Sequence, residues 1–198
     1  RFLESDELPK FFEALAEEPN ITARDYILAS LLTGARRENV LSMRWDQVNL
    51  ERGEWFIPET KNGESQRVPL ITAMHDLLKD RKADGGESEW VFPGHGASGH
   101  LANPEKAWKR ILSRAGIEDI RGTWLHDLRR SMGSWQANTG ASLAIIGKSL
   151  NHKNVNTTAI YARLAMDPVR ESMEKAAGAM FEAGGIKKDN VVNMEVIK

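Results

Sequence analysis

The sequence predicts a mainly α fold with one small, three-stranded antiparallel β-sheet, an α+β arrangement. Apolar residues recur at intervals of three and four through most of the chain, as in amphipathic helices. Between Trp45 and Leu70 the pattern changes to short extended runs separated by turn residues. With 198 residues, 41% of them hydrophobic, the chain can bury one substantial core, and a second full domain would be cramped.

Three helices are expected before the sheet. The first spans residues 5–18, with Ser5 as its N-cap. Its apolar side is formed by Leu8, Phe11, Phe12 and Leu15. The second spans residues 23–32, begins at a capping-box pattern in residues 22–25, and ends at Gly34. A short third helix is expected to follow through Val40, Leu41 and Met43.

The sheet is expected from strands at residues 48–50, 55–57 and 67–70. Arg52-Gly53 supplies the first turn, and Lys61-Asn62-Gly63 the second. An Asn-Gly pair is a strong hairpin signal, so Lys61 is expected near the tip of the second hairpin.

Helices are expected again at residues 72–81, 104–115 and 169–183. Pro104 suits the first turn of one, and Asp167-Pro168 opens the last. Residues 94–100 form a glycine-rich loop that carries His95 and His100 without an expected role.

The most informative stretch is residues 125–163, which contains two histidines, two adjacent arginines and one of the two tyrosines of the chain. Its apolar spacing predicts three short helices, broken at residues 138–140 and 151–154. His126 and Arg129 are three residues apart, so they lie on neighbouring positions of one helix side. The following segments bring His152 and Tyr161. A hydroxyl beside two imidazoles and a guanidinium suits attack on a phosphate.

Composition excludes several classes of protein. There is no cysteine, which excludes disulfides, thiolate metal sites and a cysteine nucleophile. No apolar run approaches the roughly 20 residues that cross a bilayer, and no signal-peptide pattern opens the chain. The expected class is therefore a soluble intracellular domain. Because the chain begins with Arg1, it is expected to be a piece whose upstream part is missing.

Charge is unevenly distributed along the chain. The formal net charge of −1 argues by itself against a nucleic-acid binder. However, residues 105–153 contain nine bases and four acids, whereas residues 1–20 contain two bases and six acids. The positive charge is thus concentrated around the informative stretch, although a solvated basic face would have the same composition.

Several motifs together resemble the tyrosine recombinases, the phage integrase family. Residues 33–45, TGARRENVLSMRW, resemble the first signature box of that family. His126-Asp127-Leu128-Arg129 resembles its His-x-x-Arg element, and residues 150–152 and 157–161 resemble its last two boxes. Each motif alone is weak, but their order and spacing match over essentially the whole chain.

The resemblance implies a set of active-site residues at matching positions: Arg36, Lys61, His126, Arg129, His152 and Tyr161. Two neighbouring positions depart from the common pattern. Asn39 replaces a glutamate but still offers a hydrogen-bond acceptor to support Arg36. Asn151 replaces a glycine, and asparagine tolerates the left-handed backbone better than most residues, so the turn is expected to be kept.

The chemistry of phosphodiester cleavage explains these residue types. Two guanidiniums, Arg36 and Arg129, can grip the non-bridging oxygens through charge-assisted hydrogen bonds. A phenol with a pKa of about 10 is almost entirely protonated at neutral pH, so nearby cations are expected to lower the pKa of Tyr161 and a neutral histidine to take its proton. Tyr161 then forms a phosphotyrosyl bond. Lys61 is implied as the general acid for the leaving oxygen, with His126 and His152 completing the hydrogen-bonding shell around the phosphate.

Bland alternatives exist for each residue. Arg36 and Lys61 have the pattern of surface cations, His126 with Asp127 that of a helix cap, and His152 and Tyr161 that of core residues. Trp124 and Trp135 are expected to pack rather than stack on bases. Two functional alternatives also stay open: a non-cleaving DNA-binding regulatory module of the same fold, and a type IB topoisomerase.

The family resemblance implies the remaining expectations. Residues 1–183 would form the catalytic domain of a site-specific recombinase or integrase from a prophage or mobile element, acting in the cytoplasm at the nucleoid. Residues 184–198 would be a tail that docks on a neighbouring protomer, and an upstream DNA-binding domain would be absent from this chain. The expected partners are double-stranded DNA at specific sites, a homotetramer on that DNA and DNA-bending accessory proteins. No cofactor, metal or membrane is expected.

Overall fold

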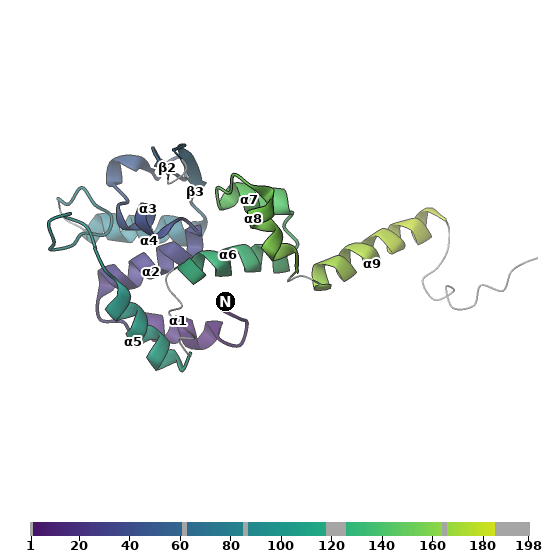
Figure 1. Ribbon diagram of the computed structural model, residues 1–198, viewed down its shortest axis with the longest axis horizontal. Helices are drawn as coiled ribbons and strands as arrows, with labels where there is room; N and C mark the ends of the chain where they lie inside the picture. The colour runs from purple at the N-terminus through teal and green to yellow at the C-terminus, as the bar shows by residue number, and fades with distance from the viewer. Residues whose placement is uncertain (1, 61–62, 85–86, 118–125, 164–165, 185–198) are drawn as a thin grey trace, which may run out of the picture.

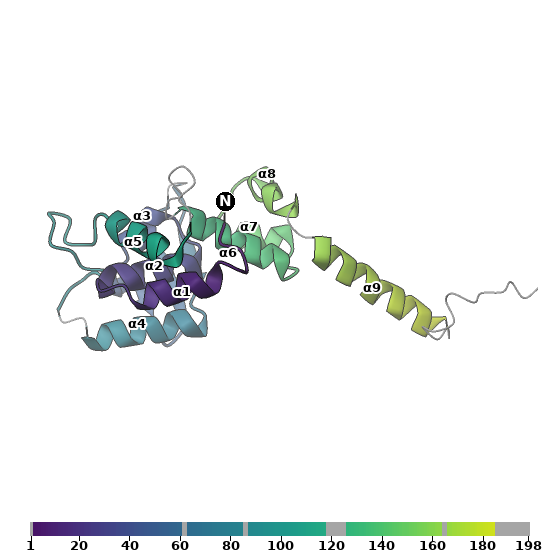
Figure 2. The same ribbon diagram turned by 90° about the horizontal axis from the view of Figure 1, so that it is seen from below.

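A computed structural model describes residues 2–60, 63–84, 87–117, 126–163 and 166–184 of the chain. Helices α1 to α8 pack into one body with the sheet at its edge, and α9 extends away from that body (Figures 1 and 2). The predicted α+β class is confirmed for these residues.

The regular elements follow one another with short connections. The α-helices are α1 (Leu8–Ala16), α2 (Ile21–Thr33), α3 (Arg37–Leu41), α4 (Thr72–Asp84), α5 (Glu105–Ala115), α6 (His126–Asn138), α7 (Leu143–Ser149), α8 (Val155–Thr158) and α9 (Met166–Ala183). The 3₁₀ helices are η1 (Trp45–Gln47) and η2 (Ala159–Arg163). The strands are β1 (Val48–Asn49), β2 (Glu54–Ile57) and β3 (Gln66–Pro69).

The predicted starts of the first two helices were wrong. Helix α1 begins at Leu8 instead of Ser5, because Pro9 is suited to the first turn of a helix, and Glu7 at the N-cap makes no side-chain cap. Phe12, expected on the buried side, is exposed. Helix α2 is capped by Asn20, whose side chain accepts a hydrogen bond from the backbone N–H of Ala23, instead of by the predicted box at residues 22–25.

The sheet has the predicted antiparallel order β1-β2-β3. Trp55 pairs with Val48 on one side and Val68 on the other, and its side chain is fully buried. The predicted second hairpin is confirmed: β2 ends at Ile57, where Pro58 cannot donate to the ladder, and β3 begins at Gln66, within one residue of the predicted start. Lys61 and Asn62 lie outside the described residues.

Two other helices are longer than predicted. Helix α4 continues past Arg81 to Asp84, since no breaker occurs before the glycines at 85–86. Helix α9 begins at Met166, and Pro168 occupies its first turn, where a missing N–H costs nothing. Trp124 and the predicted tail at 186–198 lie outside the described residues.

The hydrophobic core is formed mainly by α1, α2, α4, α5 and the sheet. Phe11, Tyr26, Trp55 and Phe92 are among its fully buried side chains. A smaller cluster joins α6, α7 and η2 through Ala137, Ile146, Leu150 and Tyr161. Tyr161 is thus the predicted site residue that belongs to a core cluster.

The N-terminal segment is tied to α6. The backbone N–H of Leu3 donates to Ser131 Oγ at 2.8 Å, and Trp135 Nε1 donates to the carbonyl of Leu3 at 2.9 Å. Trp135 is therefore held against the start of the described chain by its ring N–H. These bonds fix the helix that carries His126 and Arg129 against the start of the described chain.

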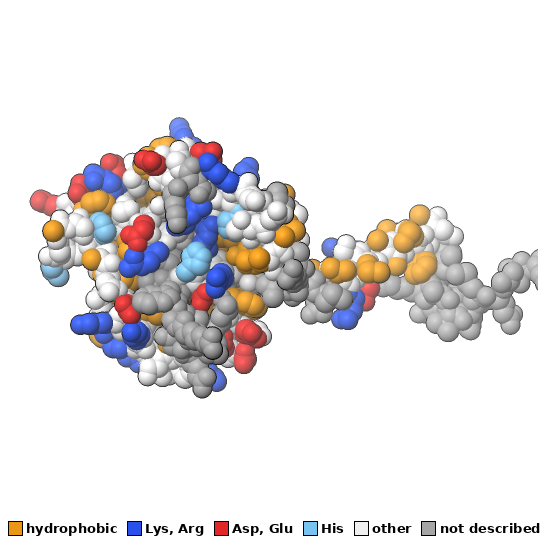
Figure 3. Space-filling model, viewed as in Figure 1, with side chains coloured by type: hydrophobic (Ala, Val, Ile, Leu, Met, Phe, Trp, Pro, Cys, Tyr) orange, Lys and Arg blue, Asp and Glu red, His pale blue; other side chains and the backbone are white. Residues whose placement is uncertain are grey.

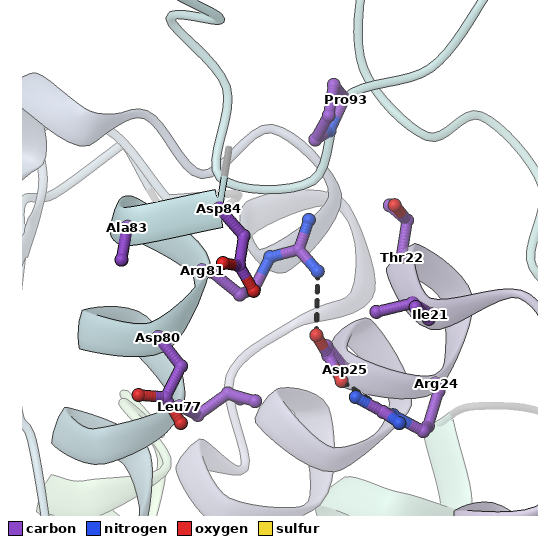
Figure 4. A pocket seen from close by; sticks show the side chains of 10 residues that line it. All are labelled: Ile21, Thr22, Arg24, Asp25, Leu77, Asp80, Arg81, Ala83, Asp84 and Pro93. Carbon is purple, nitrogen blue, oxygen red and sulfur yellow. Dashed lines mark hydrogen bonds and ion pairs between the residues drawn. The ribbon is translucent and has the colours of Figure 1, made fainter. Parts of the chain in front are cut away.

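A hollow of about 590 Å³ lies between α2 and α4 (Figure 4). Arg81 crosses it and donates to Asp25 Oδ2 at 2.7 Å, and Arg24 donates to Asp25 Oδ1 at 2.8 Å. Arg81 also donates to the carbonyl of Val91. Because the central charges of this hollow are paired with one another, it belongs to the scaffold.

Helix α9 presents apolar side chains to solvent. Val169, Met173 and Met180 are all more than half exposed, and the space-filling view shows an apolar stripe along this helix (Figure 3). None of the helices in the described ranges has the length and hydrophobicity needed to span a membrane.

Candidate active site

The candidate site is built around the C-terminal end of α7. This helix ends in a Schellman motif: the N–H of His152 donates to the carbonyl of Gly147 at 2.9 Å, and the N–H of Asn151 to that of Lys148 at 3.2 Å. The motif requires a left-handed residue, and Asn151 has φ 50°. The expectation that asparagine keeps this turn is confirmed.

Arg129 lies one turn into α6 and is buried. Its guanidinium donates to the carbonyl of Gly34 at 2.6 Å and to that of Leu150. Gly34 is the C-cap of α2 and Leu150 the C-cap of α7, so one cation satisfies the carbonyl ends of two helices. Gly34 has φ 58°, and a Cβ there would lie 2.8 Å from Leu150 Cδ2, so only glycine allows this approach.

Arg36 also contacts the C-terminal end of α7. It is the N-cap of α3, with an extended backbone, and one terminal nitrogen donates to the carbonyl of Asn151 at 3.2 Å. Its other terminal nitrogen, Nη1, is shielded from solvent and has no hydrogen-bond partner among the described residues. A buried donor without a partner costs about 1–3 kcal/mol, so this nitrogen is prepared for an incoming acceptor.

Both arginines keep their charge at neutral pH. Burial, followed by the neighbouring Arg36 cation, lowers the pKa of Arg129 to about 10. Burial also lowers the pKa of Arg36. Two cations held side by side by backbone carbonyls, with no carboxylate of the described residues acting on either, form a site that favours an anion.

His152 follows the Schellman turn and is held by the next helix. Its Nδ1 lies 2.9 Å from the hydroxyl of Thr158. Its ring is parallel to that of Tyr161, with 6.5 Å between centroids and 5° between planes. Burial, then Arg129 and Arg36, lower the pKa of His152 to about 4, so its imidazole is neutral at pH 7.

Tyr161 lies in η2, and its side chain is only 3% exposed. It packs on Gly133 of α6, where an added Cβ would lie 2.5 Å from the phenol Cζ and 2.9 Å from the hydroxyl oxygen. The pKa of Tyr161 is raised, because burial outweighs the opposing effect of Arg129 and Arg130. The expectation that nearby cations lower this pKa below its ordinary value was therefore wrong for the free protein.

His126 is the first residue of α6 and lies at the exposed margin of the site. Partial desolvation, followed by the cations of Arg130 and Arg129, lowers its pKa. Asp127 opposes this shift but is itself paired with Arg130 at 3.0 Å. At neutral pH the site thus combines two neutral imidazoles with two guanidiniums.

Two expectations about supporting residues have different outcomes. No hydrogen bond joins Asn39 to Arg36 in the described part of the chain, and the Asn39 Nδ2 is buried without a partner, so the expected support was wrong. Lys61 lies outside the described residues, but its neighbour Thr60 is buried and accepts a hydrogen bond at 3.3 Å from Asn151 Nδ2. Lys153 also pairs with Glu64 at 3.1 Å.

The β2–β3 loop is therefore linked to the end of α7 by described contacts on both sides of Lys61. A third contact runs from Gln66 Nε2 to the carbonyl of Ser149 at 3.1 Å. Seen as a surface, Lys, Arg and His side chains gather in the middle of the face shown in Figure 3, between the sheet side of the body and α6.

Five of the six predicted residues are thus brought together, and the sixth lies outside the described residues. The sequence did not single out Thr158, Gly133 or the carbonyls of Gly34 and Leu150. Thr158 could have been found from its spacing, since it lies three residues before Tyr161 on the same short helical segment. Nothing in the sequence pairs Gly133 with Tyr161.

Comparison with known proteins agrees with this fold. The sequence model of the phage integrase family matches residues 1–167. The chain belongs to the phage integrase family. Among individual relatives, prophage integrase IntF of Escherichia coli (strain K12) is 30% identical over 197 residues, which is 97% of this chain but only 41% of IntF. The chain thus spans less than half the length of that relative.

Solved structures show the same architecture. The XerH site-specific recombinase, in a post-cleavage complex with its palindromic difH substrate, gives a TM-score of 0.71 at 23% identity and covers 87% of this chain and 52% of XerH. The catalytic domain of bacteriophage HP1 integrase gives 0.66 at 20% identity and covers 87% of this chain and 93% of that domain. The fold is that of tyrosine recombinase catalytic domains.

Proposed function

We propose that residues 1–183 form the catalytic domain of a site-specific recombinase that cleaves and rejoins DNA through a 3′-phosphotyrosyl intermediate. One observation carries the proposal. Arg36 and Arg129 converge on consecutive carbonyls at the end of α7, beside His152 and Tyr161. Two fixed cations next to a phenol and neutral imidazoles match the needs of phosphoryl transfer, in which positioning and charge stabilisation dominate.

Each step of the reaction has a residue of suitable chemistry. Arg36 and Arg129 hold the non-bridging oxygens of the scissile phosphate. The Tyr161 oxygen attacks phosphorus, a neutral histidine accepts its proton, and the bond from phosphorus to the 5′ oxygen breaks. Lys61 protonates the departing 5′ oxygen. Attack by a second strand's 5′ hydroxyl reverses these steps and rejoins the DNA, and no external energy source is needed.

Burial of Tyr161 in the free protein fits this scheme. A phenol that is 3% exposed and has a raised pKa is a poor nucleophile. Entry of a phosphate between the two guanidiniums would bring the reacting phosphorus to the site, and η2 must then move Tyr161 away from Gly133. Cleavage is therefore proposed to require DNA-induced repositioning of η2.

The partners follow from the same proposal. Double-stranded DNA at a specific site is the substrate, and a homotetramer on DNA, with DNA-bending accessory proteins, is the working assembly. The exposed apolar side chains of α9 and the residues 184–198 are proposed to dock on a neighbouring protomer. Deleting residues 186–198 should weaken assembly on DNA in analytical ultracentrifugation, and an unchanged tetramer would contradict this docking role.

Covalent capture tests the cleavage proposal. The chain is incubated with a pool of nicked duplexes that have randomised arms, and denaturant-resistant protein–DNA adducts are isolated and sequenced. We expect adducts with a shared junction sequence. DNA binding in a gel shift without any adduct would favour the non-cleaving regulatory module. Relaxation of supercoiled plasmid by a monomer, without a shared sequence, would favour a type IB topoisomerase.

The role of Lys61 has its own test on the captured sequence. Lys61→Ala should impair cleavage of ordinary DNA. A bridging 5′-phosphorothiolate has a leaving group that needs no proton, so it should restore cleavage by the variant. Absence of rescue would assign the acid role to another residue.

A further inference from the structure

Thr158 makes a contact that the proposed chemistry has not yet used. It is the last residue of α8, its side chain is only 1% exposed, and its Oγ1 lies 2.9 Å from Nδ1 of His152. In the part of the chain that the structure describes, this is the hydrogen bond found for the Thr158 hydroxyl. A buried hydroxyl whose bond goes to a site histidine is well placed to control that histidine.

The surroundings restrict Thr158 to this position. Gly147 of α7 lies directly behind it, and a Cβ at Gly147 would approach Thr158 Oγ1 to 3.1 Å. A β-branched side chain has few rotamers, and the close contact with Gly147 limits the rotamers of Thr158 further. The same Gly147 accepts the backbone N–H of His152, so α7 fixes the main chain of His152 while α8 fixes its ring.

We propose that Thr158 is a positioning residue whose hydroxyl donates to Nδ1 of His152, so that Nε2–H points toward the phosphate site formed by Arg36 and Arg129. This inference rests on the proposed function. In a neutral imidazole only one nitrogen carries a proton, so a donor on Nδ1 places the proton on Nε2. His152 then donates to a non-bridging oxygen, which leaves His126 as the acceptor of the phenolic proton.

A hydroxyl is suited to this task where a carboxylate is not. The groups that face the imidazole are Arg129 and His126 on α6, Arg36 before α3, and Tyr161 on η2. A carboxylate on Nδ1 can only accept, so it would retain Nδ1–H and also favour the imidazolium. The uncharged Thr158 can donate instead, and it leaves His152 neutral.

The same bond couples the histidine to the nucleophile. Thr158 precedes Tyr161 by three residues and connects directly into η2. Because His152 is anchored on α7, the bond between His152 and Thr158 also sets where η2 begins. Loss of the hydroxyl is therefore expected to affect cleavage through His152, with the fold preserved.

The test compares three variants on the DNA sequence identified by covalent capture. Thr158→Val removes the hydroxyl at nearly constant shape and should slow adduct formation about 10- to 100-fold, by analogy with the loss of hydrogen-bond partners from metal-ligating histidines. Thr158→Ser keeps the hydroxyl and should retain most of the rate. Thr157→Val is the matched control, since Thr157 is the exposed neighbour, and should leave the rate unchanged.

A cycle with His152→Ala separates positioning from folding. If Thr158 acts through His152, Thr158→Val should cause no further loss in the His152→Ala background, whereas an equal loss in both backgrounds would overturn the proposal. Long-range ¹H–¹⁵N NMR of the DNA-bound wild type should show a protonated Nε2 and an unprotonated Nδ1. The opposite tautomer would overturn the proposal even if Thr158→Val failed to fold. Absence of any adduct from wild type would instead contradict the proposed function.

Discussion

The phenol of Tyr161 packs directly on the backbone of Gly133, and there is no space for even one additional methyl group between them. Tyr161, the nucleophile proposed for DNA cleavage, is thus buried against α6, the helix that also carries Arg129. Only glycine at position 133 allows Tyr161 to lie here, since a Cβ would be 2.5 Å from the phenol ring.

Gly133→Ala should therefore displace Tyr161. Overpacking of this kind costs about 1–3 kcal/mol, so we expect a corresponding loss in the free energy of unfolding, measured by urea denaturation. Tyr161 should also become more accessible to nitration by tetranitromethane. Gly178→Ala is the control, because a Cβ at this position in α9 meets nothing within 4 Å. Unchanged stability and nitration in Gly133→Ala would contradict the packing described.

Replacing Arg129 by lysine should be severe. A single ammonium cannot reproduce the fork that donates to both Gly34 and Leu150, and it leaves a carbonyl at a helix end without its donor. We expect adduct formation to fall by about 10²- to 10³-fold, as for loss of one stabilising donor. Arg67→Lys, an exposed residue paired with Glu54, is the matched control and should behave as wild type. Near-normal cleavage by Arg129→Lys would show that its fork geometry is dispensable.

Much of this arrangement could be predicted from the sequence, because periodicity and glycine placement are local signals. Gly34 ends α2 as expected, and the change to strand spacing after Trp45 locates the sheet. The order of the motifs also indicated five residues that the fold brings together. These predictions succeeded where a residue's own conformational preference decides the outcome.

The incorrect predictions concern features that depend on a neighbouring residue instead of on the residue's own preference. Pro9 overrides the capping preference of Ser5, so α1 begins at Leu8. The raised pKa of Tyr161 depends on burial against Gly133, a contact between separate segments that no local pattern encodes. The backbone carbonyls that hold Arg36 and Arg129 have no signature in the sequence at all.

Asn151 offers a test of the turn that holds these carbonyls. Asn151→Gly keeps the left-handed conformation, so the free energy of unfolding should stay close to wild type, apart from the lost contact to Thr60. Asn151→Val should lose about 1–2 kcal/mol, because a β-branched residue is strained at positive φ. Urea denaturation of both variants checks this order. Equal stability of the two would mean that the turn does not require the left-handed residue.

The neutral state of His152 predicts a pH dependence of stability. Its pKa is about 4 in the folded protein, against an ordinary value of 6.5. Between these values the unfolded chain binds a proton that the folded chain does not, so the free energy of unfolding should fall as pH drops from about 6.5 to about 4. Thermal unfolding of wild type and His152→Asn across this range measures the effect. An equally steep slope in the variant would assign it to other groups.

The most direct test of the central claim is to locate the covalent bond. The captured adduct is digested and its DNA-linked peptide is sequenced by mass spectrometry. We predict a nucleotide on Tyr161, no adduct from Tyr161→Phe, and normal adduct from Tyr26→Phe, since Tyr26 is fully buried in the core and is the only other tyrosine. A linkage to any other residue, or an undiminished adduct from Tyr161→Phe, would contradict the account.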